Sequence, residues 1–366
     1  MTRPLSVFAL LLAACGGAAV SPPARMVAVD SVLLKEDPDH PIGESIGIVV
    51  RATDGRVFLA DMAGRTIQRF EADGRFGGTI GTAGSGPGEL GAPGGIGLLD
   101  GDSVLAVIDP NRAVLIEFNS ADGTLRRELP FPGGAIPASG WLSDMRTTLV
   151  PVLGALHPFL RWDRLNDSVT PFGEAPAEWG GSLGLAMSHG VASLVSDSSG
   201  YLAMIPLVPG LLRLDAVGSR VTLIPIPAVR RKGEPDGAAA KALAEAKQSG
   251  RRTTAPIASM ALGLHRRSDG ALMLVHLDPD LESGSGGTQP TALRYYITLV
   301  RPDLRAACVD APIPLETDVF ARPLFAGDTV FFLARTVGAD GQAPLWLRGF
   351  VLDDASCAWI PLEPGR

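Results

Sequence analysis

The sequence predicts an all-β fold, a six-bladed β-propeller, from an internal repeat, from strand-like runs along the chain and from frequent turn signals. Residues 55–74 (GRVFLADMAGRTIQRFEADG) and 103–123 (SVLAVIDPNRAVLIEFNSADG) share one plan. In each, a strand-like run ends in Asp, a polar turn follows, a second run ends in Phe, and an Asp-Gly turn closes the unit. Asp61 and Asp109 lie 48 residues apart, and a period in the 40s built only from strands is typical of a propeller blade.

Strand-like runs with period-two alternation continue through the rest of the chain, and Asp-Gly turns separate many of them. They predict a propeller domain over 26–366, with blades at approximately 46–80, 96–129, 141–171, 191–226, 257–312 and 319–362. An open ring would leave a free sheet edge. We therefore expect the run at 26–36 to be a closing strand that pairs with 357–362. The alternative is a seventh, divergent blade within 130–180.

The first residues indicate where the chain works. Residues 1–14 carry one positive charge, and their apolar run at 5–14 is too short to span a bilayer, which is typical of a signal peptide. The segment Leu12-Ala13-Ala14-Cys15 resembles the bacterial lipobox, and this resemblance implies cleavage before Cys15 and lipidation of that residue. Residues 15–25 would then be a flexible tether. The alternative is an ordinary signal peptide with a chance cysteine.

These features predict a lipoprotein of the bacterial cell envelope. Gly16 after the cysteine resembles lipoproteins released to the outer membrane, which places the domain in the periplasm. The chain has a net charge of −7 and no basic block in its strand regions, so nucleic-acid binding is not expected. We expect a monomer that meets the membrane only through its N-terminal lipid.

One stretch resembles a known family. FLADMAGRTIQRFEADGRF, followed by GTAGSGPGELGAPGGIG, is similar to NHL-repeat propellers, especially the six-bladed secreted or lipid-anchored bacterial members. The Gly-Pro-Gly-Glu at 86–89 is the most specific part, and the resemblance covers about 45–125. It implies a six-bladed propeller. It implies no single activity, because members of this family are binding scaffolds, lyases or lactonase-like enzymes.

Strand order predicts that the long connections share one face. With strands a to d counted outward in each blade, the a–b and c–d turns lie on one face, and the b–c loops and d–a links lie on the other. The a–b and c–d turns are all short, whereas the long segments 81–94, 227–256, 278–291 and 335–344 all belong to the second class. Long loops in compact domains are commonly functional. We therefore predict that a protein, peptide or glycan binds on that face.

The link at 227–256 contains a predicted helix between blades four and five. Asp236 is suited to cap its N-terminus, residues 238–247 are rich in alanine, and Gly250 is suited to end it. With a single large apolar residue, Leu243, this helix can bury little surface. It is interpreted either as a cover over the channel or as a solvated insertion.

Candidate ligand contacts on the predicted binding face are Arg65, Arg112 and His157. Asp61 and Asp109 end strands and are suited to accept hydrogen bonds from their own turns, so they are interpreted as turn-stabilising residues. No catalytic residue is predicted, and the chain has no HExxH motif. No cofactor is required by the sequence.

Two alternatives to a binding module remain. The starts of the innermost strands carry Glu44, His189 and Asp318, which could serve a metal-dependent lyase or hydrolase in the central funnel. The other alternative is a structural subunit of the envelope. Cys308 and Cys357 begin the predicted outer strands of neighbouring blades, where Cα atoms should exceed the bridging distance of about 7 Å. A disulfide between them is therefore disfavoured, although an oxidising compartment favours one.

Overall fold

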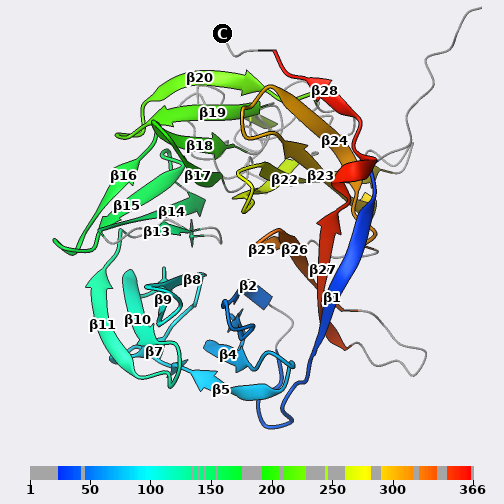
Figure 1. Ribbon diagram of the computed structural model, residues 1–366. Helices are drawn as coiled ribbons and strands as arrows, with labels where there is room; N and C mark the ends of the chain where they lie inside the picture. The colour runs from blue at the N-terminus through cyan, green and yellow to red at the C-terminus, as the bar shows by residue number, and fades with distance from the viewer. Residues whose placement is uncertain are drawn as a thin grey trace, which may run out of the picture.

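A computed structural model shows a ring of six β-sheets around a central channel (Figure 1). The structure describes residues 24–42, 46–132, 136–137, 141–143, 146–153, 155–174, 192–205, 210–227, 244–245, 260–281, 290–315, 321–335 and 344–363. The six-bladed β-propeller predicted from the sequence is confirmed, and the described residues form no seventh blade. No helix in these residues is long and apolar enough to cross a membrane.

Each blade is an antiparallel meander, with its first strand at the channel and its later strands progressively farther out. Blade one holds β2 (Ile46–Arg51), β3 (Val57–Asp61), β4 (Thr66–Phe70) and β5 (Phe76–Ile80). Blade two holds β8 (Gly95–Leu99), β9 (Val104–Asp109), β10 (Val114–Asn119) and β11 (Leu125–Pro130). Blade three holds β13 (Leu142–Ser143), β14 (Thr147–Leu153), β15 (Phe159–Asp163) and β16 (Ser168–Phe172), with β12 (Ile136–Pro137) also paired to β14.

The second half of the ring follows the same plan. Blade four holds β17 (Ser193–Asp197), β18 (Gly200–Met204), β19 (Gly210–Asp215) and β20 (Arg220–Pro225). Blade five holds β21 (Met260–Arg266), β22 (Leu272–Leu281), β23 (Pro290–Val300) and β24 (Ala306–Pro312), and β28 (Trp359–Pro361) adds a fifth strand. Blade six holds β25 (Pro323–Ala326), β26 (Thr329–Arg335), β27 (Leu345–Leu352) and β1 (Met26–Leu34).

Apolar side chains fill the junctions between neighbouring blades. Phe58 and Val107 share a cluster between blades one and two, and both are fully buried. Trp162 belongs to the cluster between blades two and three. Because both faces of the sheet are buried, an inner strand such as β9 (VLAVID) is apolar from Val104 to Ile108 instead of alternating.

The chain termini close the ring, with a different pairing from the one expected. β1 is antiparallel to β27, from Met26 opposite Leu352 to Leu34 opposite Leu345. The expected partner of β1, 357–362, instead contributes β28, which pairs with β24 on the outer edge of blade five. The N-terminal strand thus completes blade six, and the last strand of the chain extends its neighbour. Figure 1 shows β1 beside β27, and β28 beyond β24.

The disfavoured disulfide is present in the structure. Cys308 and Cys357 are bonded, with Cα atoms 5.5 Å apart. The prediction was wrong because Cys357 does not begin the outer strand of blade six. That strand is β1, and Cys357 lies instead on the segment leading into β28, beside Cys308 of β24. The bond closes a covalent link across the edge of blade five.

The predicted insertion helix is not supported. Of residues 238–247, only Ala244 and Glu245 are described, and they are too few to define an element. The signal peptide over 1–14 and Cys15 also lie outside the described residues.

Candidate functional site

Strand pairing gives the propeller two different faces. The turn face carries the a–b and c–d turns, such as 52–56 and 71–75. The loop face carries the b–c loops and d–a links, such as 62–65 and 81–94. The long segments 227–256 and 335–344 connect strand ends on the loop face, although many of their residues lie outside the described ranges. The predicted loop 278–291 is shorter than expected, because β22 continues to Leu281 and β23 begins at Pro290.

The turn face is closed by polar contacts between neighbouring blades. From blade one to blade four these contacts are Thr53 N to Asp102 Oδ2 at 2.6 Å, Arg164 to Asp100 at 2.6 Å, and Arg161 to Ala216 O at 2.7 Å. The remaining junctions have Arg266 to Ser196 O at 2.9 Å, Ser268 N to Asp328 Oδ1 at 2.9 Å, and Arg51 to Asp30 at 2.9 Å. Every blade junction is therefore bridged on this face.

A cavity of about 410 Å³ occupies the central channel. All six innermost strands contribute to its lining, which exposes polar and apolar groups in similar measure and includes Ile96, Leu98, Leu142, Leu194, Leu264 and Phe325. Its charged residues Arg51, Asp102 and Arg266 lie toward the turn face, where they take part in the contacts between blades.

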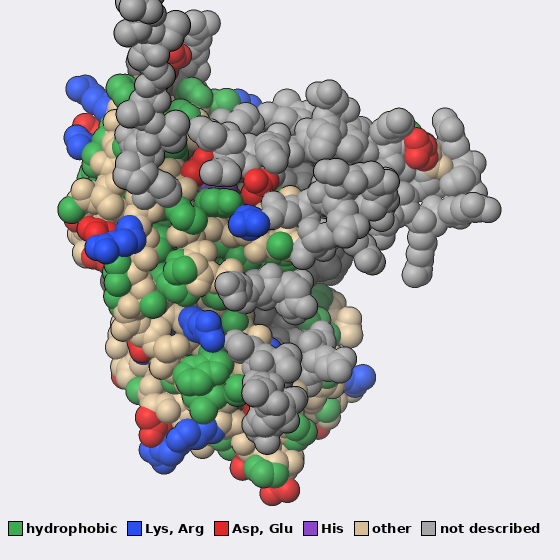
Figure 2. Space-filling model, turned by 90° about the vertical axis from the view of Figure 1, so that its right-hand side faces the viewer, with side chains coloured by type: hydrophobic (Ala, Val, Ile, Leu, Met, Phe, Trp, Pro, Cys, Tyr) green, Lys and Arg blue, Asp and Glu red, His purple; other side chains and the backbone are tan. Residues whose placement is uncertain are grey.

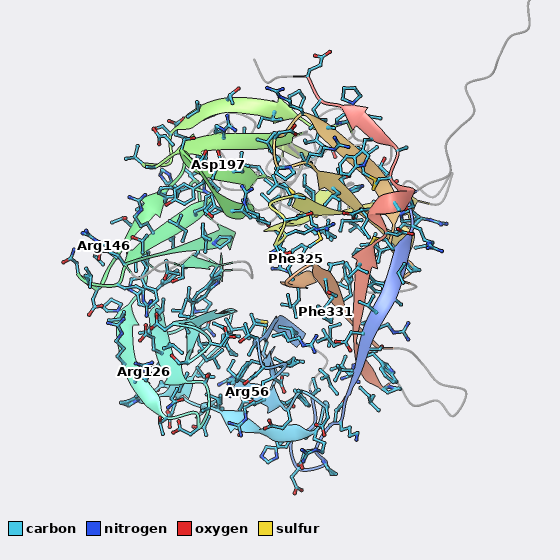
Figure 3. The ribbon with its side chains drawn as sticks, in the orientation of Figure 1. Arg56, Arg126, Arg146, Asp197, Phe325 and Phe331 are labelled. Carbon is cyan, nitrogen blue, oxygen red and sulfur yellow. A yellow bond between two sulfur atoms is a disulfide. The ribbon has the colours of Figure 1, made fainter. Side chains whose placement is uncertain are left out.

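Aromatic rings reach into the channel over glycines of the neighbouring blade. A Cβ atom on Gly97 would lie 2.6 Å from the ring of Trp141, and one on Gly263 would lie 2.8 Å from the ring of Phe325. Both positions require glycine because of this close approach. Figure 3 shows Phe325 beside the channel, whereas Arg126 and Arg146 lie at the outer rim of the ring.

His265 is the histidine on the channel wall. Its Nε2 donates to Gly327 O at 2.8 Å, and its ring stacks on Phe325 with centroids 5.0 Å apart. Burial lowers the pKa of His265 below its usual value, opposed by the hydrogen bond to Gly327. The lowered pKa favours the neutral ring, in which Nε2 carries the proton and Nδ1 is a hydrogen-bond acceptor.

A second cavity, of about 310 Å³, lies at the loop face between blades five and six. Its lining combines arginine, tyrosine and proline residues: Arg294, Tyr295, Tyr296, Pro312, Pro314 and Arg348. The Tyr295 hydroxyl accepts a hydrogen bond from Ala321 N at 2.7 Å, and burial raises its pKa to about 12. Sequence reasoning missed this cavity because its residues come from strands of two blades, with no local motif.

The predicted ligand contacts have different surroundings. Arg65 is exposed on the turn between β3 and β4, and the described residues include no hydrogen-bond or ion-pair partner for it. His157 is exposed, and its Nδ1 lies 2.7 Å from Gly173 O. Arg112 is half-buried and is bonded to Glu128 at 3.0 and 3.1 Å and to Glu89 O.

Asp109 and Arg112 together fix the link 81–94 to blade two. The fully buried Asp109 carboxylate accepts from Gly91 N at 2.5 Å and from Ala92 N at 3.1 Å. Glu128, paired with Arg112, accepts from Gly88 N at 2.8 Å. Asp109 also accepts from the amides of its own turn, in agreement with the turn-stabilising role predicted for it.

Asp61 plays the corresponding part in blade one. Its Oδ1 accepts from Gly64 N at 2.8 Å, and its Oδ2 lies 3.3 Å from Gln68 Nε2. Gln68 in turn donates to His40 O and Pro41 O, each at 3.3 Å, on the link between blades six and one. The repeated aspartates thus connect turns and links on the loop face.

The predicted funnel residues Glu44, His189 and Asp318 all lie outside the described residues. Within the described part of the chain, no three His, Cys, Asp or Glu side chains gather as a metal site would require. The structure therefore does not test the metal-dependent alternative at the positions where the sequence placed it.

Comparisons with known proteins bear on the fold. No protein-family model matches the chain, and no curated protein matches it. A member of the DUF4221 family from Bacteroides vulgatus has a similar structure, with a TM-score of 0.61 at 10% identity over 90% of this chain and 99% of that one. A putative exported protein from Bacteroides fragilis gives a TM-score of 0.56 at 11% identity, over 88% of this chain and 94% of that one.

At such low identities the likeness shows the propeller fold alone. Virginiamycin B lyase from Staphylococcus aureus aligns more weakly, with a TM-score of 0.49 at 13% identity over 90% of this chain and 94% of that one, and carries no argument about activity. The resemblance to NHL-repeat propellers is not confirmed by these comparisons. The six-bladed architecture that it implied is supported.

Proposed function

We propose that this protein is a lipid-anchored envelope component that binds a protein, peptide or glycan on its loop face, without catalysing a reaction. The proposal places it in the outer membrane, facing the periplasm, with Cys15 as the lipidated residue. The observation that carries it is the difference between the two faces. Short turns and contacts between blades close one face, whereas all the long connections leave from the other.

The second cavity gives the loop face a specific binding surface. Two of the residue types that line it, arginine and tyrosine, are enriched where proteins bind other proteins. Charged side chains of both signs are interspersed on the side of the molecule seen in Figure 2. Mixed charge of this kind argues against a nucleic-acid partner.

Two alternatives are kept from the sequence. A metal-dependent lyase or hydrolase would use Glu44, His189 and Asp318, and elemental analysis of purified protein would detect its metal. A purely structural subunit would have no ligand on the loop face.

The test compares matched charge changes on the two faces. Met62 and Arg65 on the loop face are exposed and lie three residues apart, as do Val217 and Arg220 on the turn face. The immobilised protein is offered soluble periplasmic proteins and peptidoglycan fragments. Retention of a component should be lost in the Met62→Glu/Arg65→Glu variant and kept in the Val217→Glu/Arg220→Glu variant.

A second pair tests the cavity between blades five and six. Arg294→Glu changes the loop-face cavity, and Arg305→Glu changes an exposed position on the turn face of the same blade. Reduced retention with Arg294→Glu alone supports the proposal. Equal retention by all four variants, or retention of nothing by the wild type, contradicts it.

A further inference from the structure

The N-terminal attachment point of the propeller lies on the turn face. Arg25, the last residue before β1, donates from its backbone N to Ser356 Oγ at 2.7 Å and from its guanidinium to Asp353 at 2.8 Å. Asp353 N donates back to Arg25 O at 2.9 Å. The start of β1 is therefore fixed to the C-terminal segment that follows β27.

That C-terminal segment is fixed in turn to the turn face. Asp354 accepts from Arg267 at 2.9 Å, and Arg267 belongs to the a–b turn of blade five. The next residue in that turn, Ser268, bonds to Asp328 in the a–b turn of blade six. The disulfide at Cys357 and the pairing of β28 hold the other end of the segment. The attachment point is thus a rigid part of the turn face.

From this geometry we infer that the turn face lies toward the membrane and that the loop face points away from it, toward a partner that is not part of the anchoring bilayer. The inference rests on the lipid anchor at Cys15 that is part of the proposed function. It adds to the proposed function the location of the binding partner relative to the membrane. The ligand is a periplasmic component, not a lipid of the membrane that holds the protein.

The length of the tether supports this orientation. Eight residues lie between Cys15 and Ala24; a random-coil chain of the nine steps that join them would have an end-to-end distance of about 17 Å. The seven residues of β26, which runs from the turn face to the loop face, span about 23 Å. The typical reach of the tether is therefore shorter than the height of a blade. The anchored face stays nearer to the lipid.

Two leucines provide a matched pair of probes. Leu156 and Leu165 flank the same strand, β15, at its loop-face and turn-face ends, and both are exposed. In the lipidated protein the Cys15 sulfur is alkylated and Cys308 is bonded to Cys357. A cysteine introduced at either leucine is then the only free thiol. Because both probes are on one blade, a tilt of the ring moves them together.

The experiment uses the full lipidated chain, labelled with a dye at Leu156→Cys or Leu165→Cys, in phospholipid vesicles that carry a headgroup-linked quencher. Flotation first confirms attachment, and a Cys15→Ser variant should not float. We expect a larger loss of emission from the dye at position 165 than at position 156.

Equal loss of emission, or a larger loss at position 156, would overturn the orientation while leaving the anchor intact. If the wild-type chain does not float with the vesicles, the anchor and the orientation both fail. Binding on the loop face is still decided separately by the charge-change variants.

Discussion

Arg164 of blade three and Asp100 of blade two form a bidentate ion pair, with both N–O distances at 2.6 Å. The Arg164 guanidinium also lies over the ring of the buried Trp162, 5.5 Å from its centroid. The pair joins the a–b turn of one blade to the c–d turn of the next. It is the best-aligned of the contacts that close the turn face, because both carboxylate oxygens face the guanidinium.

Removing this ion pair should weaken the turn face slightly. The hydrogen bond from Arg164 lowers the pKa of Asp100 below its usual value. Because Asp100 is 43% exposed, Asp100→Asn should lower the free energy of unfolding by only about 0.5–1 kcal/mol. Chemical denaturation at pH 7 measures the change. Asp39→Asn, at an exposed aspartate of the link between blades six and one, is the control and should have no effect.

The same pair defines an acid dependence. A lowered pKa in the folded state means that the stabilisation is present above the unfolded pKa, near 4, and is lost as the pH falls through the folded value. Stability curves of wild type and Asp100→Asn should therefore converge below about pH 4. A constant gap between the curves down to low pH would contradict this account.

The disulfide should be a major source of stability. It closes a loop with a sequence separation of 49 residues, for which chain entropy predicts about 4 kcal/mol. Reductant, or Cys357→Ser, should lower the thermal midpoint by several degrees. Reductant should have no further effect on the Cys357→Ser variant. Mass spectrometry under non-reducing conditions should find Cys308 and Cys357 in one linked peptide pair, and free thiols at both positions would show the bond to be wrong.

Gly97 should tolerate no side chain while Trp141 is present. The nearest ring atom would lie 2.6 Å from an added Cβ, so Gly97→Ala should destabilise the protein by about 1–3 kcal/mol. Trp141→Ala removes the clash, and the double variant should lose less stability than the sum of the two single variants. Strict additivity would show that the ring and the glycine do not interact.

The Asp109 carboxylate should be needed to hold the link 81–94. It is fully buried and accepts hydrogen bonds from backbone amides of the link and of its own turn. Asp109→Asn leaves amides without an acceptor, so the free energy of unfolding should fall by about 1–3 kcal/mol. Hydrogen exchange at Gly91 and Ala92 should become faster. Unchanged exchange there would contradict the assigned contacts.

His265 should make stability depend on pH near neutrality. Burial lowers its pKa in the folded state, so the unfolded chain binds the proton more readily. The free energy of unfolding is therefore highest above the unfolded-state pKa of about 6.5, and it decreases as the pH falls from there through the folded-state pKa of His265. Between about pH 5 and 7, the free energy of unfolding should change less with pH for His265→Phe than for wild type. Chemical denaturation at several pH values measures this. The exposed His157, replaced by Phe, is the control.

The fold could be predicted from the sequence because the repeat consists of residues that stabilise their own strands and turns. Asp61 and Asp109 end strands and accept hydrogen bonds from their turns, so they recur at one spacing. The ring closure could not be predicted in detail, because it depends on which strand edge each terminus meets. The disulfide was misjudged for the same reason, since it depends on β28 joining blade five.

The site was predicted less well. The sequence prediction considered only the starts of the innermost strands, whereas the channel is also lined at their turn-face ends, by Arg51, Asp102 and His265. Arg112 was predicted to be available for a ligand on its turn, yet it donates hydrogen bonds to the Glu128 carboxylate and to Glu89 O. Its role became apparent only when blade two and the link 81–94 were placed together.

Hydrogen exchange of the whole chain, with and without the envelope component that it retains, tests the central claim most directly. Binding should slow exchange on the loop face, at 62–65, 110–113 and 312–315, and leave the turns at 71–75, 120–124 and 164–167 unchanged. Protection confined to those turns would show that the ligand binds the opposite face and would contradict the proposed function.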